Sequence, residues 1–263
     1  MALVGCVEID NMSVKVYLRR QLSAEMSAKN YIQNGLVAMW DGIENIGWGQ
    51  HSDSASAWVN LMGNSNYDFT LLNASWASDG LITNQNYNMA AKSTSSISYT
   101  SNLTTEIVFE IYAIPSVSRK VFFKLGNTLK SGSYNYIMRS LAFISNPIIG
   151  WQFKNNSVMT NSGYNTPPLN TPLSIATVYD VPSGSTDHRL SQNPTMILIN
   201  NQIKEPTWFG TGMATDFTGM SISSLGNPNG FYGKVHAIRI YSRQLSNAEI
   251  GHNYVIDKQR FGI

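Results

Sequence analysis

Apolar and polar residues alternate along much of this chain, which is the pattern of strands that bury one face. In residues 106–112, Ile107, Phe109 and Ile111 occupy every second position, and we expect these three side chains to point into a core. Comparable runs, bounded by glycine, proline or asparagine, cover residues 121–125, 136–144, 148–153 and 173–179. Such spacing without intervening helices predicts an all-β fold, an antiparallel sandwich.

Two adjacent asparagines predict a tight hairpin. The apolar run of residues 196–199 and the pair Gln202-Ile203 flank Asn200 and Asn201. Asparagine tolerates the positive φ that a two-residue turn requires. We therefore expect antiparallel strands on either side of this pair.

A short helix is predicted at the C-terminus, after an apolar strand that begins at Gly233. Ser246 and Glu249 have the spacing of a capping box, and Leu245 and Ile250 that of a hydrophobic staple. Ile250 and Tyr254 are four residues apart, so they share a helical face that we expect to pack on the sandwich. We expect the helix to close one end of the core.

The chain is predicted to divide into an N-terminal extension, residues 1–33, and a domain, residues 34–263. Within the extension, Val14, Val16 and Leu18 alternate with polar residues, which indicates a strand, while residues 23–33 have a more helical composition.

Both ends of the domain resemble a known family. The sequence Gly-Lys-Val-His-Ala-Ile-Arg-Ile-Tyr-Ser-Arg-Gln-Leu-Ser at residues 233–246, followed by Glu-Ile at 249–250, resembles the closing segment of laminin G-like, concanavalin A-like jelly-roll domains. Residues 35–42 and 58–64 resemble the opening strand and the next element, although Asn60 replaces the usual aspartate. The resemblance implies a two-sheet jelly roll that binds glycans or proteins.

Composition excludes several classes of partner. Charged residues are 13% of the chain and the formal net charge is +2, too near neutral for electrostatic nucleic-acid binding. No apolar run approaches the roughly 20 residues of a membrane span, so we predict no membrane insertion. A single cysteine allows no intramolecular disulfide. No secretory signal is recognised at the start of the sequence.

Glycoside hydrolysis is tested because some concanavalin A-like proteins are β-glucanases with a Glu-x-Asp-x-Glu strand. Residues 8–12 keep the first two acids of that pattern, but Met12 replaces the third. Glu106 and Glu110 share a strand face about 13 Å apart, farther than the about 5–9.5 Å of glycosidase carboxylates. We expect both to be solvent-facing charges.

Histidine chemistry is not indicated either. The four histidines are scattered, and none has the spacing of a nucleophile or metal motif. His236 falls in the period-two pattern with Lys234, Ile238 and Ile240, so we expect a structural role. The prediction is that the protein is not an enzyme.

Ligand binding is assigned to aromatic residues in predicted loops, where binding residues concentrate. Trp48 and His51 lie in a glycine-rich loop, and Trp208 lies near glycine, so these three are the predicted ligand-binding residues. Trp40, Trp58 and Trp151 lie in strand-like contexts and are predicted to be core.

No resident cofactor or metal site is predicted, although the resemblance allows a calcium ion on a rim loop. The loop aspartates available to it are Asp41, Asp53, Asp68, Asp79 and Asp216. Their spacing is not that of a calcium-binding loop, which needs several convergent oxygens.

Three functions stay open. We favour a non-catalytic structural or receptor-binding protein of a bacteriophage virion, assembled in the bacterial cytoplasm and released by lysis. Its partners would be other virion proteins, further copies of itself and host-surface glycans, with residues 1–33 as an assembly arm. The alternatives are a stand-alone bacterial carbohydrate-binding module and, less favoured, a divergent glycoside hydrolase.

Overall fold

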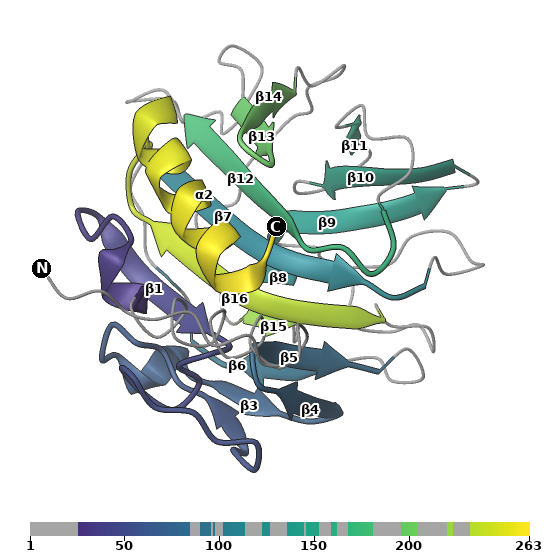
Figure 1. Ribbon diagram of the computed structural model, residues 1–263. Helices are drawn as coiled ribbons and strands as arrows, with labels where there is room; N and C mark the ends of the chain where they lie inside the picture. The colour runs from purple at the N-terminus through teal and green to yellow at the C-terminus, as the bar shows by residue number, and fades with distance from the viewer. Residues whose placement is uncertain are drawn as a thin grey trace, which may run out of the picture.

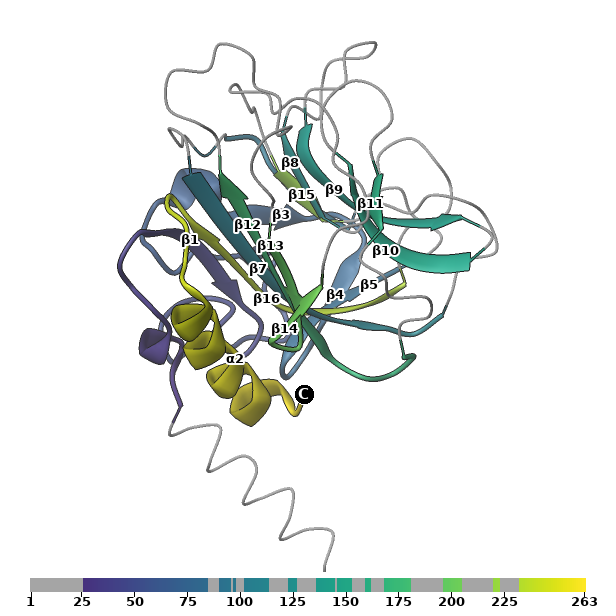
Figure 2. The same cartoon turned by 90° about the horizontal axis from the view of Figure 1, so that it is seen from above.

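Two antiparallel β-sheets face each other, and one α-helix covers the outer face of one of them (Figures 1 and 2). The computed structural model describes residues 26–84, 90–95, 97, 102–113, 123–126, 136–144, 146–152, 159–161, 168–180, 196–204, 220–222 and 232–263. The predicted all-β, antiparallel two-sheet sandwich with a C-terminal helix is confirmed.

Sheet 1 is built around β16. Its order is β14-β13-β12-β7-β16-β5-β4, and β1 also pairs with β16. The strands are β1 (Leu36–Asp41), β4 (Ala74–Ala77), β5 (Gly80–Thr83), β7 (Asn102–Ile111), β12 (Leu173–Asp180), β13 (Met196–Ile199), β14 (Gln202–Lys204) and β16 (Gly233–Tyr241). One edge of β16 pairs with β7, and the other is shared between β5 and β1.

Sheet 2 has the order β11-β10-β9-β8-β15-β6-β3-β2. Its strands are β2 (Ala57–Trp58), β3 (Phe69–Leu71), β6 (Ala91–Ser93), β8 (Phe123–Gly126), β9 (Tyr136–Ile144), β10 (Asn146–Gln152), β11 (Met159–Asn161) and β15 (Met220–Ile222). A 3₁₀ turn, η2 (Ser65–Tyr67), precedes β3. The strands predicted within residues 121–153 are therefore confirmed, with shifts of a few residues at their ends.

The core lies between the two sheets and is apolar. Ile107, Phe109 and Ile111 of β7 are buried in it, as their alternation predicts. Trp40 and Trp58 are fully buried, which confirms their assignment to the core. The side chain of Trp151 lies outside the described residues.

A β-bulge in β16 changes which side chains face the core. Val235 pairs with Phe109 and Ala237 with Val108, so His236 is the extra residue. Val235 and Ile238 therefore both face the core, three positions apart. The prediction that His236 follows the period of Ile238 and Ile240 is wrong, because the bulge places its ring against Phe261 of the helix, with centroids 5.1 Å apart.

The helix α2 (Asn247–Phe261) begins as the sequence predicts. The Ser246 Oγ accepts a hydrogen bond from the Glu249 N–H, and the Glu249 carboxylate accepts one from the Ser246 N–H. Leu245 and Ile250, the predicted staple pair, are buried in one cluster. Among the described residues, no helix is long and apolar enough to cross a membrane.

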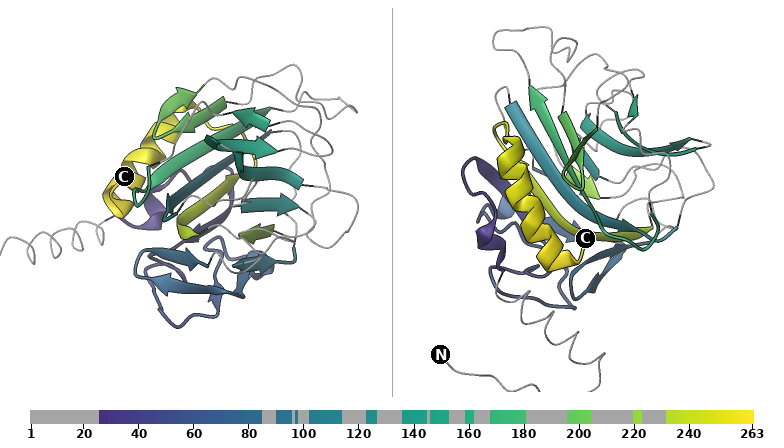
Figure 3. Two further views of the ribbon diagram at one scale, coloured as in Figure 1. Left: turned by 90° about the vertical axis from the view of Figure 1, so that its right-hand side faces the viewer. Right: turned by 45° about the horizontal axis from the view of Figure 1, so that its top comes forward.

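The position of α2 differs from the prediction. The helix lies along the outer face of sheet 1 instead of closing an end of the core (Figure 3). Ile250 is buried as predicted, whereas Tyr254 is half-buried. The buried side of the helix consists of Ile250, Asn253, Ile256, Asp257, Arg260 and Phe261. That side is broader and more polar than the Ile250–Tyr254 pair suggests.

Residues 26–33 pack beside α2 instead of standing apart from the domain. They contain a 3₁₀ turn, η1 (Ala28–Asn30), and Tyr31 is 2% exposed. The Tyr31 hydroxyl donates to Asp257 at 2.8 Å, and the Ile32 N–H donates to Asn253 at 3.0 Å. The last eight residues of the predicted extension thus contribute to the packed body. The strand predicted at residues 14–18 lies outside the described residues.

The hairpin at the asparagine pair is confirmed. Asn200 and Asn201 have φ values of 48° and 61°. Ile199 of β13 pairs directly with Gln202 of β14. Two consecutive residues with positive φ are the requirement of a type I′ turn.

Candidate functional site

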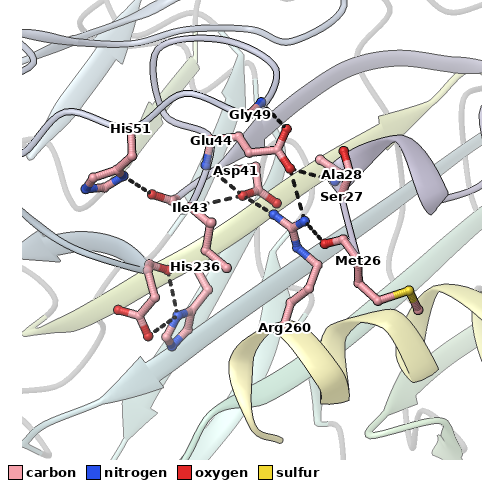
Figure 4. Close-up of polar contacts among 12 residues, drawn as sticks. Met26, Ser27, Ala28, Asp41, Ile43, Glu44, Gly49, His51, His236 and Arg260 are labelled. Carbon is pink, nitrogen blue, oxygen red and sulfur yellow. Dashed lines mark hydrogen bonds and ion pairs between the residues drawn. The ribbon is translucent and has the colours of Figure 1, made fainter. Parts of the chain in front are cut away.

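The 42–56 loop, which joins β1 to β2, carries Trp48 and His51. Its first turn is held by Asp41 at the end of β1, which is fully buried. The Asp41 Oδ1 accepts hydrogen bonds from the N–H groups of Ile43 at 2.9 Å and Glu44 at 3.1 Å. The chain therefore leaves the sheet in one fixed direction (Figure 4).

Arg260, near the end of α2, ties this turn to the helix. Its Nη2 donates to Asp41 Oδ1 at 2.7 Å, and its Nη1 donates to Glu44 Oε1 at 3.1 Å. The same Nη1 donates to the carbonyl of Met26 (Figure 4). One buried guanidinium thus joins the loop, the helix and the segment that leads into η1.

Glu44 distributes this support along the loop. Its Oε1 accepts from the Ala28 N–H at 2.8 Å, and its Oε2 accepts from the Gly49 N–H at 2.9 Å. Gly49 has a φ of +70°, a conformation that glycine adopts at little cost. The carboxylate therefore fixes the backbone immediately after Trp48.

Burial and neighbouring charges shift the pKa values of Asp41 and Glu44 in opposite directions. Burial raises the pKa of Asp41, and Arg260 only partly offsets it. The Asp41 Oδ2 is buried without a hydrogen-bond partner among the described residues, which fits that direction. Burial acts to raise the pKa of Glu44 as well, but the N–H groups of Ala28 and Gly49 together with Arg260 outweigh burial and leave the pKa below its usual value.

Trp48 lies on the η1 side of the loop. Its ring is half-buried and packs against the cluster beneath α2. The Lys29 ammonium lies over this ring, 5.6 Å from its centroid. A cation–π contact of this kind occupies part of the ring surface.

His51 lies on the β4 side. Its Nδ1 is 3.0 Å from the carbonyl oxygen of Gly42, and its Nε2 is 2.8 Å from Asp53 Oδ1. Its ring meets the edge of Trp76 on β4, with centroids 6.4 Å apart. Trp76 in turn contacts Trp58 at 5.4 Å.

The three predicted binding residues do not form one described cluster. Trp48 and His51 share a loop but contact different elements, η1 and β4. Trp208 lies outside the described residues. The predicted binding residues do not include Trp76, which reaches His51 from 25 positions away, and Asp53 is predicted only as a loop aspartate. No local pattern joins these residues, because a strand pairing brings them together.

The aspartates considered for calcium are dispersed. Asp41 is paired with Arg260, Asp53 with His51 and Asp79 with Lys234, while Asp68 accepts from the Asn60 N–H. Asp216 lies outside the described residues. No group of three or more histidine, cysteine, aspartate or glutamate side chains within the described ranges is arranged to hold a metal ion.

Glu106 is not the solvent-facing charge that its strand position suggests. It is 2% exposed, and its Oε2 accepts from Arg239 Nε at 2.7 Å and from Asn253 Nδ2 at 2.8 Å. Burial raises the pKa of Glu106, and Arg239 opposes that effect. The prediction is wrong because α2 covers this part of the strand.

Glu110 is also partly covered. Its side chain is 12% exposed and lies 3.4 Å from Lys234 Nζ. The Lys234 ammonium also donates to both oxygens of Asp79. Both candidate acids of the hydrolase alternative are therefore engaged by cations of β16.

No protein-family model matches the chain, and no curated protein sequence matches it. Among solved structures, Trypanosoma rangeli sialidase aligns with 94% of this chain at a TM-score of 0.62 and 14% identity. This chain spans 38% of the length of that sialidase. Domain 4 of AbnA, a GH43 extracellular arabinanase from Geobacillus stearothermophilus solved in complex with arabinotriose, aligns with 83% of this chain and 97% of its own. That TM-score is 0.54 at 11% identity. These similarities support a lectin-like β-sandwich fold.

Proposed function

We propose that this protein is a non-catalytic adhesion module that binds glycans through the 42–56 loop. One observation carries the proposal: the loop places half-exposed aromatic groups at the surface while Arg260 and Glu44 hold its backbone from beneath. A binding loop that is ordered before the ligand arrives loses less entropy on binding. The arabinotriose complex of the AbnA domain adds support from a protein of similar fold.

The engagement of the candidate acids favours binding over hydrolysis. Glycosidases need one carboxylate as an acid and another as a base or nucleophile, both at the substrate. Glu106 faces Arg239 beneath α2, and Glu110 faces Lys234. Glu106 is therefore buried away from any substrate, and Glu110, whose side chain is 12% exposed, is engaged by a cation.

A glycan array probed with the purified 263-residue chain tests the proposal. We expect binding to at least one glycan, confirmed by isothermal titration calorimetry with that glycan in solution. Substitution His51→Ala should weaken it about tenfold or more, because the loop loses the bond that orients Asp53. The absence of binding to every glycan on the array would refute the proposal, and turnover of a bound glycan would refute its non-catalytic part.

We further propose that the module acts on a bacteriophage virion, together with other virion proteins and further copies of itself. Both ends of the domain resemble laminin G-like jelly rolls of the kind found in phage and prophage structural proteins, and this resemblance motivates the setting. Residues 1–25 would then serve as the assembly arm, since residues 26–33 pack against α2 and belong to the folded body. Mass spectrometry of purified particles should detect the full chain and not a chain that lacks residues 1–25. Normal incorporation of the truncated chain would contradict this role for the arm.

A further inference from the structure

Asp53 combines exposure with a fixed orientation. Its side chain is 79% exposed, yet its Oδ1 lies 2.8 Å from His51 Nε2. Its Oδ2 makes no hydrogen bond to any residue that the structure describes. A carboxylate oxygen can accept hydrogen bonds from two hydroxyl groups. Asp53 is therefore an oriented acceptor at the surface.

The backbone beneath Asp53 is held on both sides. Asn45 is fully buried, its Nδ2 donates to the Ser52 carbonyl at 2.9 Å, and its Oδ1 accepts from the Ser52 N–H at 2.8 Å. His51 contacts the Gly42 carbonyl at 3.0 Å. Little order remains to be gained in this segment when a ligand binds.

Asp53 disfavours anionic ligands. Among the described residues it contacts His51, and no lysine or arginine side chain there pairs with it. An exposed carboxylate repels a carboxylated glycan, whereas a neutral sugar offers hydroxyl groups from which the carboxylate can accept hydrogen bonds. The site therefore suits an uncharged sugar better than an anionic one.

Trp76 supplies an apolar wall beside this pair. Its ring is half-buried, and its Nε1 donates to the Ala55 carbonyl at 2.8 Å. The only polar atom of the indole is thus used internally, and Trp58 supports the ring from the core side. What the indole offers to solvent is aromatic surface, which suits the C–H face of a sugar ring.

We infer that Asp53 and Trp76 form a subsite for an uncharged sugar, in which Asp53 accepts hydrogen bonds from ring hydroxyls and His51 is the positioning residue. The inference rests on the proposed glycan-binding function and names its ligand class. The competing subsite on the same loop, Trp48 with Lys29, carries a positive charge and would favour carboxylated glycans.

The experiment compares two charge classes and three variants of the full chain. The probes are an array of neutral and carboxylated glycans, followed by calorimetry with the strongest binder in low and high salt. The variants are Asp53→Ala, Lys29→Gln and, as a matched control on the same loop, the exposed residue change Gln50→Ala. Melting temperatures should be unchanged, because all three side chains are exposed.

We expect neutral glycans to bind with little salt dependence, Asp53→Ala to weaken binding about tenfold or more, and Lys29→Gln and Gln50→Ala to leave it unchanged. Neutral binding that Asp53→Ala does not alter would overturn the subsite and leave the proposed function intact. Binding of carboxylated glycans alone, abolished by Lys29→Gln, would also overturn the subsite and leave the proposed function intact. Failure to bind any glycan would overturn both.

Discussion

The two faces of sheet 1 are both buried, but only the outer face combines apolar contacts with a charged network. The inner face meets sheet 2 through apolar side chains such as Phe109 and Ile240. The outer face also packs apolar residues of α2, namely Ile250, Ile256 and Phe261. It adds a charged network of Glu106 and Arg239 on the sheet and Asp257 on the helix. Apolar contact has no direction, whereas each hydrogen bond of a guanidinium does. The charged network therefore fixes where along the sheet the helix lies.

Arg239 illustrates how demanding that arrangement is. Its Nη1 and Nη2 donate to the two oxygens of Asp257 at 2.8 and 2.7 Å, and the Tyr31 ring lies 4.0 Å from the guanidinium carbon. Although burial lowers the pKa of Arg239, Asp257 and Glu106 raise it well above its usual value. A buried pair of this kind contributes little net stability, but removing one partner leaves an uncompensated charge.

Of the changes considered, Arg239→Ala should cause the largest loss of stability on the outer face of sheet 1. It leaves Glu106 and Asp257 buried without their cation, so we expect the free energy of unfolding to fall by about 3–5 kcal/mol. Denaturant titration followed by circular dichroism measures the loss. Arg243→Ala is the matched control, because Arg243 pairs with Glu249 at the surface and should cost about 1 kcal/mol or less. Equal losses in the two variants would show that the buried network has no special role.

Glu44→Gln tests whether the same chemistry holds the 42–56 loop. The amide keeps one acceptor oxygen, so one of the N–H groups of Ala28 and Gly49 loses its partner. We expect a loss of about 1–3 kcal/mol in the free energy of unfolding. Hydrogen exchange should be faster at one of these two amides, while amides of β7 exchange as before. Uniformly faster exchange across the sheet would mean that Glu44 supports the whole fold and not the loop.

Ile240→Val probes the inner face with a small change. The side chain is fully buried between the sheets, and deleting one methyl group should cost about 0.5–1.5 kcal/mol. The amides of Ala28 in η1 and Gly49 in the loop should keep their exchange rates, because apolar contacts around Ile240 can readjust without moving α2. Altered exchange at Gly49 would show that the two faces are coupled.

This contrast also explains what the sequence could predict. Alternation in β7 identifies its inner residues, and the spacing of Ser246 and Glu249 identifies the start of α2, because both signals are local. The outer network is not local: Arg239 and Glu106 are 133 residues apart, and Tyr31 and Asp257 are 226 apart. A charged residue on a strand is usually exposed, so the sequence predicts that Glu106 faces solvent.

The candidate site divides in the same way. His51 was identified from its place in a glycine-rich loop, a signal that lies within ten residues. Its partner Trp76 depends on the pairing of β4 with β5, and the orientation of Asp53 depends on the position of His51. The bulge at His236 has no sequence signature of its own. Alternation alone places His236 and Ile238 on one face of the strand, whereas the bulge puts them on different faces.

Glu249→Gln tests a charged contact at the exposed N-terminal end of α2. Its effect on the free energy of unfolding should be the smallest of the four substitutions. Arg243 lowers the pKa of Glu249 to about 2, against burial and with help from Ser246. A glutamate in the unfolded chain has a pKa of about 4.3. The stability contributed by the Glu249 charge is therefore complete above that pH and is lost as the pH falls toward 2. Because the group is near the surface, we expect only about 0.5–1 kcal/mol at pH 7. The wild-type and variant unfolding free energies should converge near pH 2 and, at pH 7, approach each other in 1 M salt. A difference that persists at pH 2 would mean that the glutamate acts through packing and not through its charge.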